Sequence, residues 1–152
     1  MNTRGMYFEE FEVGMEMTSV GRTITETDVV NFAGLSGDYT QLHTDEEHAK
    51  SSLFGKRVAH GVLVLSIATG LAVRLGFIEG TALAFRELTW KFSQPVFFGD
   101  TIRVRARVKE LKPMPRLGGG SVIFDVSVIN QDGKTVQKGE WNMLVASQEG
   151  AG

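Results

Sequence analysis

The sequence predicts an α+β fold in which a curved antiparallel β-sheet wraps one long α-helix. Residues 61–76 are the most apolar stretch of the chain, with nonpolar residues on nearly every side of the predicted helix. Four later stretches alternate polar and nonpolar residues, as half-buried antiparallel strands do. Because turn residues separate these stretches, we expect a meander of neighbouring strands with one apolar face.

The N-terminal part predicts one strand and one helix. Residues 15–24 alternate less regularly than the later stretches but fit a strand. A helix that ends near Ser36 follows, and Thr25 with Asp28, or Thr27 alone, would cap its first turn.

A second capping pattern, Thr44 followed by Glu47, predicts a short helix over residues 45–50. The long apolar helix begins at Gly61. It is too short to cross a bilayer and contains Arg74, so a membrane span is not expected. A helix with so little polar surface needs neighbours all around it.

The four strands of the meander are predicted at residues 87–92, 102–109, 122–128 and 140–145. The second is the clearest, because apolar positions alternate there with the basic Arg103, Arg105, Arg107 and Lys109. Turns are expected at residues 98–100, 113–120 and 131–134, and the glycines at 118–120 suggest a flexible hairpin. A curved sheet of this kind around one helix is the hot-dog fold. We expect it to be a single domain over residues 1–152.

Composition narrows the classes of function. Lys and Arg number 16 against 18 Asp and Glu, so the net charge of −2 provides no general field for nucleic acid. The basic row of the second strand is expected to face solvent, with contact to phosphates of coenzyme A as the alternative. The chain has no cysteine, and residues 1–20 lack the layout of a signal peptide, so we expect a cytoplasmic protein.

Asp38 and His43 are the candidates for acid/base chemistry. Gly37 is expected to end the first helix in a left-handed turn, and Asp38 follows directly. A helix C-terminus carries partial negative charge, so a carboxylate there suggests a chemical role, and the same charge should favour its protonation. The structural alternatives are a hydrogen bond within the turn for Asp38 and a loop or capping role for His43.

A wider pattern surrounds this pair. Residues 32–49, which contain Gly37-Asp38 and His43, together with Ala59-His60-Gly61, resemble the hydratase signature of the MaoC-like dehydratases, the (R)-specific enoyl-CoA hydratase family. The resemblance extends over nearly the whole chain. One departure is Thr40-Gln41, where the family usually has Asn-Pro, so substrate positioning is expected to differ.

The resemblance implies a hydro-lyase that adds water reversibly to a trans-2-enoyl-CoA and gives an (R)-3-hydroxyacyl-CoA. Asp38 and His43 would act together on the water, while the backbone N–H of Gly61 would polarise the thioester carbonyl. Substrate contacts are expected from Thr40, His60, Val62 and Phe85, with Leu88 and Trp90 also lining the acyl slot. For His60, we first expect a structural role in positioning the start of the long helix. The resemblance also implies a homodimer joined edge to edge, with further assembly left open. No cofactor is expected beyond the coenzyme A of the substrate.

Two other functions stay open. A thioesterase on the same fold often uses a carboxylate within the long helix, and residues 61–73 contain none. A non-catalytic acyl-CoA-binding or regulatory domain would need neither member of the candidate pair. No metal is expected, because the set of candidate metal ligands does not have the spacing of residues on one face of a helix. That set is His43, His48, His60 and Asp45.

Overall fold

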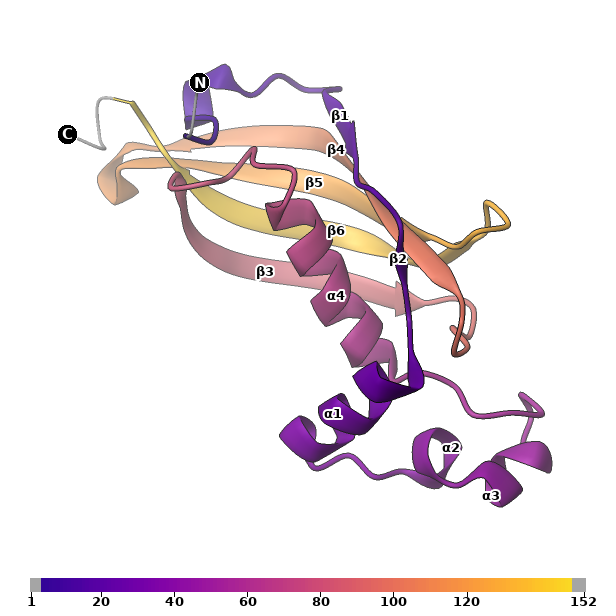
Figure 1. Ribbon diagram of the computed structural model, residues 1–152. Helices are drawn as coiled ribbons and strands as arrows, with labels where there is room; N and C mark the ends of the chain where they lie inside the picture. Colours follow the sequence, from indigo (N-terminus) through magenta and orange to yellow (C-terminus); the bar gives the residue numbers. More distant parts are fainter. Residues whose placement is uncertain (1–3, 149–152) are drawn as a thin grey trace.

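The computed structural model describes residues 4–148, and its elements follow the predicted order (Figure 1). The strands are β1 Glu16–Thr18, β2 Arg22–Thr23, β3 Ala82–Phe92, β4 Thr101–Met114, β5 Gly119–Ile129 and β6 Thr135–Ala146. The α-helices are α1 Glu26–Ser36, α2 Gln41–Thr44, α3 Glu46–Lys50 and α4 Gly61–Val73, and 3-10 turns cover Phe8–Glu10 and Pro115–Leu117. The single domain over residues 1–152 stays a prediction, with residues 1–3 and 149–152 outside the described part.

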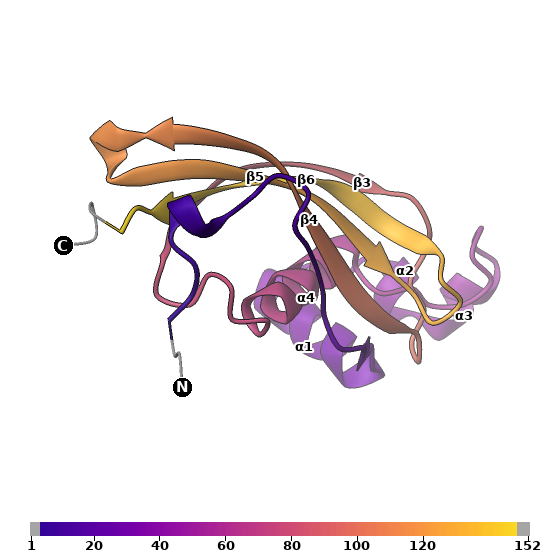
Figure 2. The same cartoon turned by 90° about the horizontal axis from the view of Figure 1, so that it is seen from above.

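One antiparallel sheet runs in the order β1-β4-β5-β6-β3, with β2 also paired to β4. Figure 2 shows this sheet curving over one side of α4, while α1, α2 and α3 gather near the first turn of α4 in Figure 1. The hot-dog arrangement predicted from the alternation is therefore confirmed. In the described part of the chain, no helix is both long and apolar enough to span a membrane.

The core lies between α4 and the middle of the sheet. The predicted inward side chains of β4 and β5, such as Val104 and Phe124, are no more than 1% exposed. They form one cluster with the buried side of α4, which includes Val64 and Ala68. Burial of these apolar side chains is the main force that holds the helix on the sheet.

The predicted strand over residues 15–24 is interrupted. Ser19 lies between β1 and β2, where its N–H donates to the Val104 carbonyl at 2.8 Å and its hydroxyl accepts from the Val104 N–H at 2.9 Å. A side-chain oxygen thus replaces the backbone carbonyl of a regular ladder, which splits the strand.

Helix termini confirm one prediction and correct two. The Thr25 hydroxyl accepts from the Asp28 N–H, and the Asp28 carboxylate accepts from the Thr25 N–H, as the capping box requires. The second box is wrong, because α3 is capped by Asp45, whose carboxylate accepts from the His48 N–H. Helix α4 ends at Val73 rather than at residue 76, since the chain then turns through a glycine with φ +86°.

The hairpin predicted at residues 113–120 joins β4 to β5, but of its three glycines only Gly118 lies in the turn. Gly118 takes a left-handed turn with φ +75°, and the next two glycines belong to β5. A Cβ on Gly119 would lie 1.9 Å from the Val145 carbonyl oxygen, and one on Gly120 would lie 2.4 Å from the Phe8 ring. These glycines are therefore needed for close packing.

The sheet covers only one side of α4. Leu88 and Phe92, predicted to face inward, are 42% and 56% exposed because β3 is the edge strand of the sheet. Val62 and Val73 on α4 are exposed as well. The neighbours expected on every side of the helix are thus not all supplied by the described residues of one chain.

Candidate functional site

Asp38 is placed by the end of α1. Gly37 adopts φ +79°, and its N–H donates to the Ala33 carbonyl at 2.9 Å, which is the left-handed helix end expected from the sequence. The Asp38 N–H then donates to the Ser36 hydroxyl at 3.1 Å. The chain is thereby turned so that the next residues approach the start of α4.

The Asp38 carboxylate is held by Thr40. Its Oδ1 accepts the Thr40 hydroxyl at 2.6 Å and the Thr40 N–H at 3.1 Å. These two bonds, the hydroxyl first, lower the pKa of the Asp38 carboxyl below its ordinary value. The expectation that the pKa of Asp38 would be raised is therefore wrong, because the two Thr40 donors stabilise the charged form.

His43 lies on α2, with its Nδ1 atom 2.7 Å from the Val58 carbonyl oxygen. A carbonyl can only accept a hydrogen bond, so Nδ1 carries the hydrogen in the neutral ring. Nε2 is then left with a lone pair. The fold thus fixes the tautomer in which this second nitrogen can take a proton from water.

His60 touches both members of the pair. It is 2% exposed, and its Nε2 donates to the backbone carbonyl of Asp38 at 2.9 Å. Its ring stacks on that of His43 with centroids 3.9 Å apart and planes 27° from parallel. The Nδ1 atom of His60 has no hydrogen-bond partner among residues 4–148.

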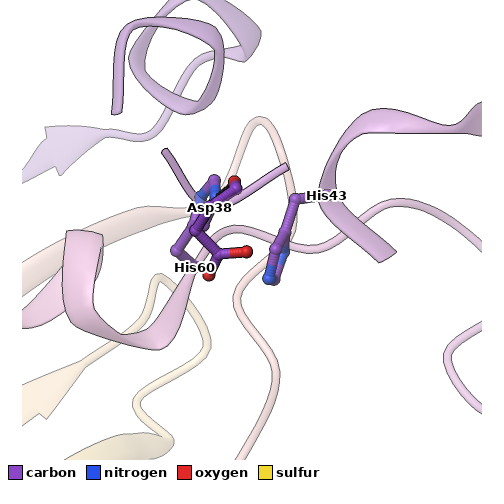
Figure 3. A group of neighbouring side chains, drawn as sticks. All are labelled: Asp38, His43 and His60. Carbon is purple, nitrogen blue, oxygen red and sulfur yellow. Dashed lines mark hydrogen bonds between the residues drawn. The ribbon is translucent and has the colours of Figure 1, made fainter. Parts of the chain in front are cut away.

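The three side chains meet in one small volume. A ligand-capable atom of each of Asp38, His43 and His60 lies within 4.8 Å of the other two, and Figure 3 shows the Asp38 carboxylate turned toward the His43 ring. Asp45 and His48 are not in this group, since Asp45 caps α3 and His48 is exposed. The two imidazole rings are stacked, so their nitrogen lone pairs lie in nearly parallel ring planes. Lone pairs in parallel planes do not converge well on one metal ion, and they suit hydrogen bonding to a water better.

A cavity of about 430 Å³ borders His43 and the first turn of α4. Its wall is mainly apolar and includes Leu42, Phe54, Val58, Val62, Phe92 and Val96.

Of the four residues expected to contact substrate, only Val62 lines this cavity. Thr40 donates to the Asp38 carboxylate and the buried His60 donates to the Asp38 carbonyl, so their contacts with substrate stay predictions. Phe85 packs on Trp141 with ring centroids 5.6 Å apart, in the part of β3 that pairs with Met143. Leu88 and Trp90 are not part of this cavity wall either, so an acyl slot that they line stays a prediction.

The start of α4 is packed tightly against the sheet. A Cβ on Gly61 would lie 2.6 Å from Cδ1 of Phe92, so this position admits no side chain without a shift of the ring. Gly61 is the first residue of α4 and borders the cavity. Its N–H finds no acceptor in the described part of the chain, as is usual in the first turn of a helix.

Gln137 is the site residue that sequence reasoning missed. It is 2% exposed, lines the cavity, and its Nε2 donates to the Gly61 carbonyl at 3.1 Å. The prediction began the last strand at residue 140. Had the inward positions Trp141 and Met143 been extended backwards in steps of two, they would have placed a glutamine on the core face, which marks a polar group in need of partners.

Comparison with known proteins identifies the family of the chain. The family profile described as "MaoC like domain" matches residues 10–129. The chain is 32% identical over 143 residues to the (R)-specific enoyl-CoA hydratase of Rhodospirillum rubrum, a match that covers 93% of each protein. It is 43% identical over 103 residues to Protein MaoC of Klebsiella aerogenes, which covers 68% of this chain and 30% of that longer protein.

A solved structure, described as a monoamine oxidase regulatory protein from Archaeoglobus fulgius, superposes with a TM-score of 0.88 at 36% identity. This match covers 95% of the chain and 97% of the other protein. The matched family profile, which spans both the Asp38 to His43 segment and the start of α4, shows that the chain belongs to the MaoC-like domain family.

Proposed function

We propose that this protein is a hydro-lyase that adds water reversibly to a trans-2-enoyl-CoA and gives an (R)-3-hydroxyacyl-CoA. The observation that carries the proposal is the meeting of the Asp38 carboxylate with the His43 imidazole, since His43 borders a cavity that Gly61 borders as well. A carboxylate, an imidazole and an amide donor around an apolar cavity are the groups that hydration of an enoyl thioester needs. The name of the R. rubrum relative supports the same reaction.

In the proposed reaction, one water is held between the Asp38 carboxylate and Nε2 of His43. As the water oxygen bonds to C3, Nε2 accepts a water proton and the electrons of the double bond move toward the thioester oxygen. The Gly61 N–H stabilises that oxygen, and a donor of this kind typically contributes about 3 to 4 kcal/mol. His43 then returns the proton to C2, which restores the carbonyl and the neutral imidazole.

The division of work within the pair follows from the hydrogen bonds of each group. The Thr40 donors lower the pKa of the Asp38 carboxyl and make it a weaker base. The free Nε2 of His43 faces no such competition, because the ring hydrogen is on Nδ1. We therefore assign proton transfer to His43, while Asp38 orients the water and stabilises the imidazolium that forms.

Hydrolysis of the thioester is the nearer rival. Helix α4 contains no Asp or Glu between Gly61 and Val73, so the position that often carries a thioesterase carboxylate is apolar. A regulatory domain that binds an acyl-CoA without turnover is the second rival. It is kept as an outcome of the test because one similar structure is described as regulatory.

The test incubates the purified protein with crotonyl-CoA. Loss of the enoyl absorbance indicates hydration, release of free thiol indicates hydrolysis, and binding without either indicates a regulatory domain. Asp38→Asn should lower kcat for hydration by about 100-fold or more without a change in melting temperature. Asp132→Asn, in the exposed turn between β5 and β6, is the matched control and should keep wild-type activity.

The proposal includes assembly into a homodimer through β3. That strand lies at the edge of the sheet, and it exposes large apolar side chains that a second copy would cover. A cytoplasmic location also stays a prediction, with which the absence of cysteine is compatible.

A further inference from the structure

We propose that Gln137 is a positioning residue that holds the first turn of α4 so that the Gly61 N–H faces the reacting carbonyl. The inference rests on the proposed hydration and adds a residue that acts through Gly61 rather than on the water. Its basis is a chain of two hydrogen bonds that connects β3, β6 and α4 next to the cavity.

The orientation of the Gln137 amide is fixed by its partners. Its Oε1 accepts the indole N–H of Trp90 at 2.8 Å, and its Nε2 donates to the Gly61 carbonyl at 3.1 Å. An indole N–H can only donate and a carbonyl can only accept, so the reverse orientation of the amide would lose both bonds. A buried polar group without a partner is unfavourable, which keeps the amide in this orientation.

Two residues of the sheet, Phe92 and Gln137, contact the Gly61 backbone. Phe92 and Gln137 are paired residues of β3 and β6, so they lie side by side at the end of the sheet. The Phe92 ring fills the space where a Gly61 side chain would begin, and Gln137 binds the Gly61 carbonyl. Contact on one side and a hydrogen bond on the other fix the Gly61 backbone, and with it the direction of the Gly61 N–H.

This arrangement predicts an effect on turnover rather than on binding. The oxyanion forms during the reaction, so a displaced Gly61 N–H weakens stabilisation of the transition state more than that of bound substrate. Loss of the Gln137 bonds should therefore lower kcat and leave KM nearly unchanged. A glutamine that contacted the substrate directly would instead raise KM when removed.

The test replaces Gln137 by methionine, which has similar size and makes neither hydrogen bond. With crotonyl-CoA, Gln137→Met should lower kcat by roughly 10-fold or more while KM stays within about 3-fold. Trp90→Phe removes the indole donor from outside the cavity wall, so it should lower kcat in the same direction. The double variant should lose less than the product of the two single losses, because both act through one amide.

Val136→Ala is the matched control for lost stability. Val136 is the neighbour of Gln137 in β6, is fully buried and takes no part in the hydrogen-bond chain, so the variant should be less stable yet keep kcat. In a wild type that hydrates crotonyl-CoA, an unchanged kcat or a raised KM in Gln137→Met would overturn the proposal.

A second readout separates this inference from the proposed function. The ¹⁵N and ¹H chemical shifts of the Gly61 amide can be measured in the free protein, and we expect them to change in Gln137→Met but not in Val136→Ala. If the wild type does not hydrate crotonyl-CoA, the proposed reaction fails while the amide shifts still test the positioning. Unchanged shifts in Gln137→Met would then overturn the inference on its own terms.

Discussion

Thr40 has a role in the structure that the sequence did not predict. Predicted as a substrate contact, it directs its hydroxyl to the Asp38 carboxylate at 2.6 Å. Thr40 is also the residue before α2, yet its side chain makes no capping bond to that helix. The hydroxyl therefore serves the carboxylate rather than the helix. Thr40-Gln41 stands where the family usually has Asn-Pro, so in this chain the Thr40 hydroxyl orients Asp38.

Thr40→Val should free one oxygen of that carboxylate. Because the Thr40 hydroxyl is the largest cause of the lowered Asp38 pKa, its removal should raise the pKa toward the ordinary value. The carboxylate would also rotate more freely, and kcat/KM for hydration should fall by about 10-fold. Carboxyl ¹³C NMR titration and steady-state kinetics measure the two effects. Thr40→Ser keeps the oxygen, and a loss in that variant equal to the loss in Thr40→Val would contradict this role.

The sequence was sufficient for Asp38 and His43 because their placement depends on local features, a glycine helix end and a short spacing. The sequence could not predict whether Phe85 borders the cavity, because that depends on where along β3 the sheet meets α4. The pKa of Asp38 could not be predicted either, because the direction depended on which way the Thr40 hydroxyl points.

At the scale of elements, an ion pair connects β2 to α1, the helix that precedes Asp38. Arg22 donates to both oxygens of the Asp28 carboxylate at 2.9 Å. The same carboxylate completes the capping box of α1 through the Thr25 N–H. One side chain thus joins a strand of the sheet edge to the start of the helix whose other end leads into the site.

This ion pair predicts a loss of stability in acid. The Arg22 hydrogen bonds are the largest cause that lowers the pKa of Asp28 to about 2. A carboxyl with a lowered folded-state pKa contributes stability that is complete above its unfolded pKa of about 3.9 and is lost as pH falls toward 2. Allowing for partial solvent exposure of Arg22, the contribution near pH 7 is about 1 to 2 kcal/mol.

Urea unfolding at pH 7, 4 and 2.5 measures this loss. Asp28→Asn should be less stable than the wild type at pH 7, and the difference should shrink as the pH falls through the window. Asp132→Asn is the control, since it changes the same residue type in an exposed turn. An equal pH dependence in wild type and Asp28→Asn would show that this carboxylate does not contribute.

Alternation of polar and nonpolar residues predicted the buried faces of β4, β5 and β6. For β3 it predicted a buried face as well, but Leu88 and Phe92 on that face are exposed. Each of these three strands has another strand of this chain on both sides, and their buried side chains form one cluster with those of α4. Strand β3 has a neighbour on one side only, so its apolar residues remain exposed despite the same pattern. The pattern shows that a face is apolar, and it does not show which molecule covers that face.

At the scale of the whole molecule, this exposure supports the proposed homodimer. The β3–α4 patch consists of exposed apolar residues on the edge strand and on the uncovered side of the central helix, namely Val73, Leu83, Phe85 and Leu88. The free edge of β3 offers backbone donors and acceptors to another strand, and the patch offers apolar area beside it. The proposed dimer would place Phe85 in the surface between two copies, and its contact with the acyl chain stays a prediction.

Leu88→Lys tests this assembly. A lysine in the middle of β3 would bring two like charges together in an edge-to-edge pair, and it would remove an apolar contact in each copy. We expect the wild type to sediment as a dimer at micromolar concentration and Leu88→Lys to shift toward monomer. Leu117→Lys, exposed in the turn between β4 and β5, should leave the dimer intact. A monomeric wild type, or a variant that dimerises as well as the wild type, would show that β3 is not the interface and that the apolar patch has another occupant.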